Sequence, residues 1–138
     1  LAPVLADDHV HIKRVATAQA ASPVKIAVET YRTGEDVIAT CKPLLYEFRT
    51  YTSRTIALVK YHMEVEAYIR EALAPAPSRS VRRVDVYREE HQARVIVERG
   101  TIAQFLGRKG MNAAVASKLT GYGLVLVDEA DLGKTARA

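Results

Sequence analysis

The chain contains 138 residues, of which 49% are hydrophobic, and its formal net charge is +4 at pH 7. A chain of this length can form one ordinary domain or two very small domains that share a core, because a unit of about 65 residues is near the lower limit of independent stability. The mild basic excess favours polyanionic partners, but it does not resemble the dense basic tails that coat nucleic acid indiscriminately.

The cellular compartment can also be predicted from the sequence. The single cysteine, Cys41, excludes an intramolecular disulfide and fits a reducing cytoplasm. No apolar stretch approaches the roughly 18 residues that span a bilayer, and no signal-peptide pattern is found. We therefore predict a cytoplasmic protein without a membrane partner. The chain begins with Leu1 instead of Met, which fits a fragment of a longer protein.

The first half of the chain is expected to mix strands with helices. Runs of β-branched residues predict strands over residues 10–15, 24–28 and 56–61. A helical stretch is expected over residues 36–51, with a break at Pro43. The segment 63–73 contains good helix formers, and Val65, Ile69 and Leu73 recur every four residues as one apolar stripe. This segment is therefore predicted to be a helix.

Two prolines in the segment 74–78 mark a linker between the halves. Beyond it we expect strands at 81–87 and 93–97 around a charged turn, a short helix at 101–106, a helix at 111–120 and a strand at 124–127. With the helix 63–73 in front, the order is α-β-β-α-α-β. The likeness of residues 24–29 to residues 93–98 indicates an internal duplication. We divide the chain into residues 1–74 and 75–138, the second domain taking helix 63–73 as its first helix.

The loop between the two helices of the second half carries the clearest functional signal. Gly107 and Gly110 are three residues apart and flank Arg108 and Lys109. Glycine has no Cβ, so a sugar-phosphate chain can lie against the backbone. The helix that follows presents free amides and the positive end of its dipole to the same place. Such a pair of glycines is a weak signal by itself, because the spacing also occurs in ordinary turns.

The residues around this loop resemble a known family. The segments IAQFLGRKGMN (102–112) and ASKLTGY (116–122) are similar to the second KH domain of the bacterial transcription factor NusA. The likeness continues upstream through residues 69–76, which resemble the joint between the two KH domains of that family, and reaches the strands of the first KH domain. It implies an α+β fold of two tandem type-II KH units. It also implies binding of single-stranded RNA and control of pausing, termination and antitermination by RNA polymerase.

The first unit departs from the family pattern at its loop. The family has a glycine pair there, whereas this chain has Cys41-Lys42-Pro43-Leu44. Proline removes a backbone donor where the family offers amides to phosphate. We therefore expect a degenerate first unit and an RNA-competent second unit.

The predicted RNA site centres on the loop and extends along the flanking elements. The apolar side chains of Ile102 and Leu106, with strand 124–127, are candidates for a groove that takes unstacked bases. Asn112 is expected to cap the helix or contact the backbone, and Lys118 adds a positive charge. The full set of predicted RNA-binding residues is Gly107, Arg108, Lys109, Gly110, Asn112, Ile102, Leu106 and Lys118.

Other kinds of site have little support in the sequence. His9 and His11 alternate along a strand, but no further ligands accompany them, so no metal site is predicted. No nucleophile motif or acid–base pair indicates an enzyme, and no cofactor or small-molecule substrate is expected. The preferred function is to bind a nascent transcript and so regulate elongation, pausing, termination or antitermination. The alternatives are a module that docks on RNA polymerase and a KH protein of ribosome assembly.

Overall fold

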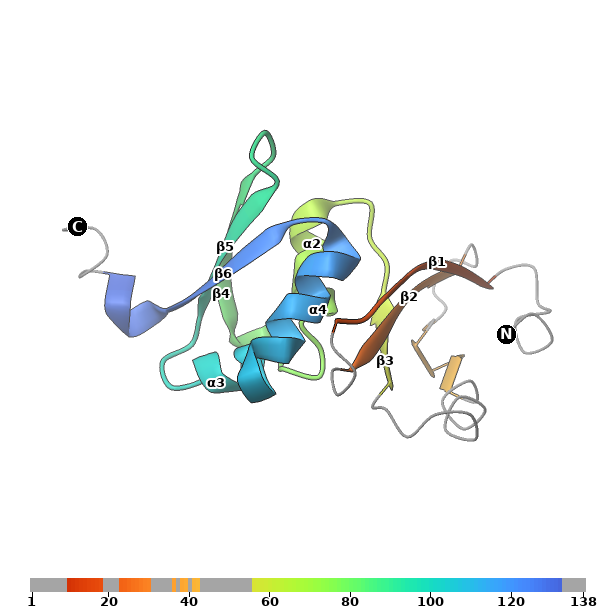
Figure 1. Ribbon diagram of the computed structural model, residues 1–138, viewed down its shortest axis with the longest axis horizontal. Coiled ribbons are helices and arrows are strands. Elements are labelled where there is room, and N and C mark those ends of the chain that lie inside the picture. The colour runs from red at the N-terminus through yellow and green to blue at the C-terminus, as the bar shows by residue number, and fades with distance from the viewer. Residues whose placement is uncertain are drawn as a thin grey trace.

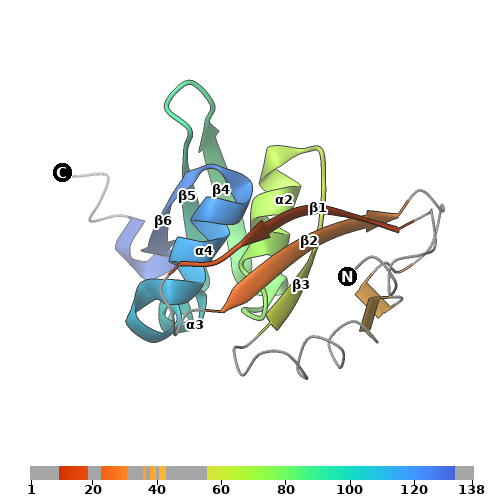
Figure 2. The same ribbon diagram turned by 45° about the vertical axis from the view of Figure 1, so that its right-hand side comes forward.

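The computed structural model describes residues 10–18, 23–30, 36, 38–39, 41–42 and 56–132. These residues form two three-stranded sheets with helices packed between them (Figure 1). Figure 2 shows the same layers from a second direction. The α+β class expected from the sequence is confirmed.

The two sheets have the same topology. The first sheet contains β1 (Val10–Ala16), β2 (Val24–Thr30) and β3 (Ile56–Lys60). The second contains β4 (Val81–Tyr87), β5 (Gln92–Val97) and β6 (Gly123–Asp128). In each, the middle strand runs antiparallel to the first strand and parallel to the third. The shared topology agrees with the duplication inferred from the sequence.

The helices complete the expected order in the second half. They are α2 (Val65–Ala72), α3 (Ile102–Leu106) and α4 (Met111–Thr120). The sequence α2-β4-β5-α3-α4-β6 is the predicted α-β-β-α-α-β order, and the observed ends lie within two residues of the expected ones. Short 3-10 turns occupy Ser78–Ser80, Arg108–Gly110 and Glu129–Asp131.

The helical stretch expected over residues 36–51 is described only in part. Ile38, Ala39, Cys41 and Lys42 are helical, and the Asp36 carboxylate accepts hydrogen bonds from the amides of Ile38 and Ala39 at 3.2 Å each. An acidic side chain in this position is a common way to start a helix. Pro43 lies outside the described residues, as does the rest of the stretch.

The core of the protein lies around α2 and α4, which are packed between the two sheets (Figure 1). One cluster of buried side chains joins these helices to both sheets, with Val95 from the second sheet and Ala27 from the first among its members. On the far face of the first sheet, Ile26, Val28 and Leu58 pack with Cys41 in a separate cluster. The first sheet is therefore covered on both faces, which explains why residues 24–28 carry little of the alternation expected for a half-exposed strand.

The one charged residue of that buried run, Lys25, ties the first sheet to the end of α2. Its side chain is 0% exposed, and Nζ donates hydrogen bonds to the carbonyl oxygens of Ala72 and Ala74, the latter at 2.7 Å. Carbonyl groups at a helix C-terminus have no partner within the helix, and they favour a cation. Burial nevertheless lowers the pKa of the ammonium to about 7. The charged form is thus stabilised by two carbonyl oxygens and opposed by desolvation.

The other end of the helix pair is fixed by an aromatic residue. The Tyr68 hydroxyl of α2 donates a hydrogen bond of 3.3 Å to the carbonyl oxygen of Leu119, near the end of α4. Its ring meets the Tyr61 ring edge-on at a centroid distance of 5.0 Å. Burial raises the pKa of Tyr68 to about 12, so the hydroxyl remains a donor at neutral pH.

Replacing Lys25 by Met should remove a specific pH dependence of stability. Between pH 7 and 10.5 the unfolded chain holds a proton at Lys25 that the folded chain has largely lost. The free energy of unfolding of the wild type should therefore rise with pH in this window, by up to about 1.4 kcal/mol per unit. Chemical denaturation across the window measures the difference between the two proteins.

The matched control is Lys60→Met, at an exposed position of β3, which should follow the wild-type pH dependence. Parallel pH profiles for the wild type and Lys25→Met would show that Lys25 does not change its protonation on folding in this window.

Candidate nucleic-acid interface

The glycine loop 107–110 forms a tight connection between α3 and α4. The amide of Gly107 donates to the carbonyl of Ala103 at 3.0 Å, and the amide of Gly110 donates to the carbonyl of Gly107 at 3.1 Å. Gly107 and Gly110 both have φ of 73°, and Lys109 between them has φ of 55°. Side chains with a Cβ rarely adopt positive φ, so the two glycines make this turn possible.

The two glycines have different surroundings. A Cβ on Gly107 would lie 2.5 Å from the Asn112 Cβ and 3.0 Å from its backbone nitrogen, so glycine is needed there for close packing against α4. A Cβ on Gly110 would have no atom within 4 Å. Gly110 therefore leaves open surface at the start of α4, where another chain can approach the backbone.

Asn112 is a structural anchor within this site. Its side chain is buried, and Nδ2 donates to the carbonyl oxygens of Leu73 and Phe105, at 2.9 Å each. These bonds connect the start of α4 to the end of α2 and to the last turn of α3. Asn112 does not cap α4, and its contacts are with carbonyl groups of the protein backbone. Its two N–H donors are thereby occupied, and only the side-chain oxygen is left for other partners.

The electrostatic character of the loop is positive. Arg108 and Lys109 are exposed, and the first turn of α4 contains no acidic side chain. No side chain caps this end of the helix. The positive end of a ten-residue helix therefore lies next to two exposed cations, which suits an anion.

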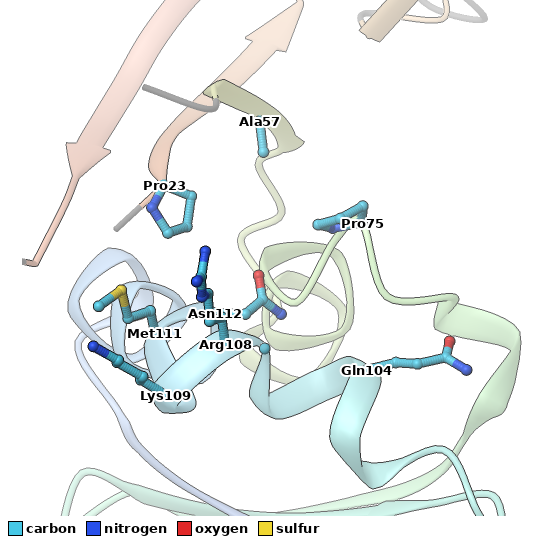
Figure 3. Close-up of a pocket in the computed structure, with 9 residues that line it drawn as sticks. Pro23, Ala57, Pro75, Gln104, Arg108, Lys109, Met111 and Asn112 are labelled. Atoms are coloured by element: carbon cyan, nitrogen blue, oxygen red, sulfur yellow. The ribbon is translucent and has the colours of Figure 1, made fainter. Parts of the chain in front are cut away.

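A pocket of about 510 Å³ opens beside the loop (Figure 3). Arg108 extends from the loop into the space between Pro23 and Asn112, whereas Lys109 points away from it. The pocket is lined by residues from both halves of the chain, namely Pro23, Ala57, Pro75, Gln104, Gly107, Arg108, Lys109, Met111 and Asn112. The contribution of Pro23, Ala57 and Pro75 could not be found in the sequence, since these residues are far from the loop along the chain.

The other residues predicted to bind RNA do not all lie beside the glycine loop. Ile102 is partly buried against the core, while Leu106 beside the loop is 38% exposed. The helix α3 packs against β6, whose Leu124 and Leu126 face the core and whose Val125 is 52% exposed. Lys118 is exposed in the last turn of α4, about 10 Å along the helix from its start. The fold thus brings Asn112 to the loop but leaves Lys118 at the other end of the helix.

The turn that leads into α3 is fixed by acidic groups after β6. The amide of Arg99 donates to the Glu129 carboxylate at 2.8 Å, and the amide of Gly100 donates to the Asp128 carboxylate at 3.1 Å. Hydrogen bonds from the amides of Ala130 and Gly100 hold the pKa of Asp128 below its usual value. These contacts position α3, and through it the glycine loop.

Other kinds of site have little support in the part of the chain that the structure describes. His9 lies outside it, and within it no group of three His, Cys, Asp or Glu side chains could hold a metal ion. Among the same residues, no helix combines the length and the apolar character needed to cross a membrane.

Comparisons with known proteins agree with the sequence resemblance. A family model described as the NusA-like second KH domain matches residues 65–134, just over half of the chain. Two curated relatives carry the name transcription termination/antitermination protein NusA. The one from Halalkalibacterium halodurans is 28% identical over 134 residues, and the one from Rickettsia prowazekii is 25% identical over 135 residues. These alignments cover 94% and 92% of this chain, but only 34% and 26% of the relatives.

A solved structure shows the same fold at low sequence identity. The crystal structure of APE1850 matches with a TM-score of 0.58 and 16% identity, covering 91% of each chain. At this identity the likeness concerns the fold alone.

Because the two glycines have different surroundings, substitution of Gly107 and of Gly110 should lower the free energy of unfolding by different amounts. Gly107→Ala should destabilise the protein by about 4 kcal/mol, because a backbone with φ of 73° and ψ of 180° is essentially restricted to glycine and costs about 2 kcal/mol for another residue, and the overlap with Asn112 costs about 2 kcal/mol more. Gly110→Ala should cost only a backbone contribution of about 1 kcal/mol. Urea denaturation of both variants measures the difference. Equal losses would show that Asn112 moves away at little cost.

Proposed function

Because the chain belongs to the family of NusA-like second KH domains, we propose that it binds single-stranded RNA at its 107–110 loop. The fold is α+β and contains two tandem type-II KH units. The proposed role is to hold a nascent transcript during transcription termination or antitermination, the processes that appear in the names of the curated relatives. The function is binding, without a catalytic step or a cofactor.

The observation that carries the proposal is the open backbone at Gly110. It lies at the uncapped N-terminus of α4, beside two exposed cations. The amides of Gly110 and Met111 already donate to the carbonyl oxygens of Gly107 and Arg108. A phosphate oxygen placed at Gly110 would therefore be held by the positive end of the α4 dipole and by pairing with Arg108 or Lys109. A simple turn would require the glycine conformations, but it would not require this combination of free space and positive charge.

The flanking elements extend the proposed site. Leu106 and strand β6 offer apolar surface to unstacked bases, with Ile102 supporting Leu106 from the core side. Lys118 would pair with a phosphate further along the strand, because it lies at the far end of α4. Asn112 contributes mainly by holding the loop in place.

Of the two KH units, the second is proposed to provide the main phosphate site, at its loop 107–110. At the corresponding place in the first unit, Lys42 is exposed and Pro43 lies outside the described residues. A proline cannot donate a backbone hydrogen bond, so this segment offers fewer donors to phosphate. RNA polymerase, which lies next to a nascent transcript, is the protein partner that we propose.

A negative charge introduced at Gly110 provides a direct test of the proposed phosphate site. Gly110→Asp should abolish most of the RNA affinity, because it places a negative charge where a phosphate is proposed to bind. The fold should persist, since the new Cβ has free space and Asp tolerates positive φ. Gly110→Asn is the matched control, with nearly the same shape and no charge, and it should retain more affinity.

Both variants can be compared with the wild type by fluorescence anisotropy on labelled single-stranded RNA, with circular dichroism as the folding control. RNA affinity of a folded Gly110→Asp protein equal to that of the wild type would remove the loop from the mechanism.

The salt dependence of binding should report the two loop cations. For single strands, each neutralised phosphate contributes about −0.7 to the slope of log affinity against log salt. Changing both Arg108 and Lys109 to Ala should therefore flatten the slope by about 1.4, and it should weaken unrelated RNA sequences to a similar extent. A salt series on two unrelated single-stranded RNAs tests both expectations. An unchanged slope would show that these side chains do not contact phosphate.

A further inference from the structure

The pocket beside the glycine loop is built by both halves of the chain. Pro23 immediately precedes β2, Ala57 belongs to β3, and Pro75 comes from the linker after α2. The opposite side is formed by the loop, by Gln104 of α3 and by the start of α4. The first unit therefore contributes surface to the site of the second unit.

A buried hydrogen-bond network holds these surfaces together. Three successive carbonyl groups at the end of α2 are each paired: those of residues 72 and 74 with Lys25, and that of Leu73 with Asn112. In the strand register, Lys25 is the neighbour of Ala57. The same network thus places Ala57, Pro75 and Asn112 around one space. Groups that buried hydrogen bonds hold in place need little further ordering on binding.

The chemistry of the pocket suits a flat heteroaromatic group. Pro23, Ala57 and Pro75 present apolar surface, and the Arg108 side chain extends between Pro23 and Asn112 (Figure 3). A guanidinium group is planar, stacks on aromatic faces and donates hydrogen bonds at its edge. The side-chain oxygen of Asn112 lies on the side of Ala57 and can accept a hydrogen bond. A volume of about 510 Å³ is within the range of small-ligand sites.

The position of the pocket favours a base of the bound strand over a free small molecule. Gly107 and Arg108 belong both to the pocket and to the loop that is proposed to hold a phosphate. A base inside the pocket and a phosphate at Gly110 would therefore be close neighbours along one strand. Arg108 and Lys109 both belong to the pocket lining, but Arg108 extends into the space between Pro23 and Asn112 whereas the side chain of Lys109 points away from that space (Figure 3), so the two cations have different positions relative to a base.

We propose that this pocket receives one nucleobase of the strand held by the loop, and that the first unit contributes to RNA recognition through Pro23 and Ala57. This inference rests on the proposed RNA-binding function. It gives Arg108 a role that Lys109 lacks: the guanidinium stacks on or hydrogen-bonds to the base, in addition to the phosphate contact that both cations are proposed to make.

Abasic substitution along the RNA tests the proposal. The probe is a short single-stranded RNA selected for binding to the wild-type chain from a random library, with each base removed in turn. One abasic position should reduce wild-type affinity about tenfold through loss of the base in the pocket. Ala57→Leu fills the pocket with a larger side chain. It should weaken the intact RNA about tenfold, and removal of the same base should then have no further effect.

Three further variants serve as controls and as a second test. Ala130→Leu makes the same change at an exposed position near the C-terminal end of the described residues, and it should leave the abasic profile unchanged. Arg108→Lys keeps the charge but loses the planar group. Removal of the same base should then no longer lower the RNA affinity, while the slope of log affinity against log salt stays constant. Lys109→Arg should leave the profile unchanged. The Arg108 and Lys109 variants decide the question if Ala57→Leu unfolds.

The outcomes separate this inference from the function on which it rests. RNA binding by the wild type with an abasic profile that neither Ala57→Leu nor Arg108→Lys alters would overturn the base pocket and leave loop binding intact. Failure of the wild-type chain to select any RNA from the library would overturn both proposals. The pocket would be supported if removal of one and the same base lowers the RNA affinity of the wild type but not that of Ala57→Leu or Arg108→Lys.

Discussion

The end of α2 leaves carbonyl groups inside the protein, and the need to pair them organises much of the structure. Lys25 from the first sheet and Asn112 from α4 supply the donors. An unpaired buried carbonyl would cost about 1–3 kcal/mol, so these two polar residues are retained among apolar neighbours. Their bonds fix the first sheet against the helices and the helices against the glycine loop. The geometry of the candidate site follows from the way in which one helix ends.

Positive charge serves two purposes at different depths in this fold. The buried ammonium of Lys25 is surrounded by protein and interacts with carbonyl oxygens, so it acts on stability. The charges of Arg108 and Lys109 are exposed, so they act on partners. The glycines divide in a similar way, because Gly107 permits close packing against Asn112 and Gly110 leaves the surface open. Structural and binding roles thus lie side by side within a few residues.

The two units share a topology but use one strand position differently. In the second sheet Arg94 lies on the outer face and pairs with Asp85 at 3.3 Å. The corresponding residue of the first unit is Lys25, whose sheet is covered by α2 and α4 on that face. The same kind of side chain is therefore a surface ion-pair partner in one unit and an interior anchor in the other. This divergence converts the first unit into a support for the second.

The sequence by itself determined the local elements and the loop. The four-residue spacing of Val65 and Ile69 predicted α2, and the spacing of Gly107 and Gly110 predicted a turn open to phosphate, because both patterns depend only on the geometry of neighbouring residues. The burial of Lys25 and the pocket formed with Pro23, Ala57 and Pro75 could not be predicted in this way. Only the tertiary structure decided them, because they arise when helices of the second unit cover a sheet of the first and bring together residues that are distant along the chain.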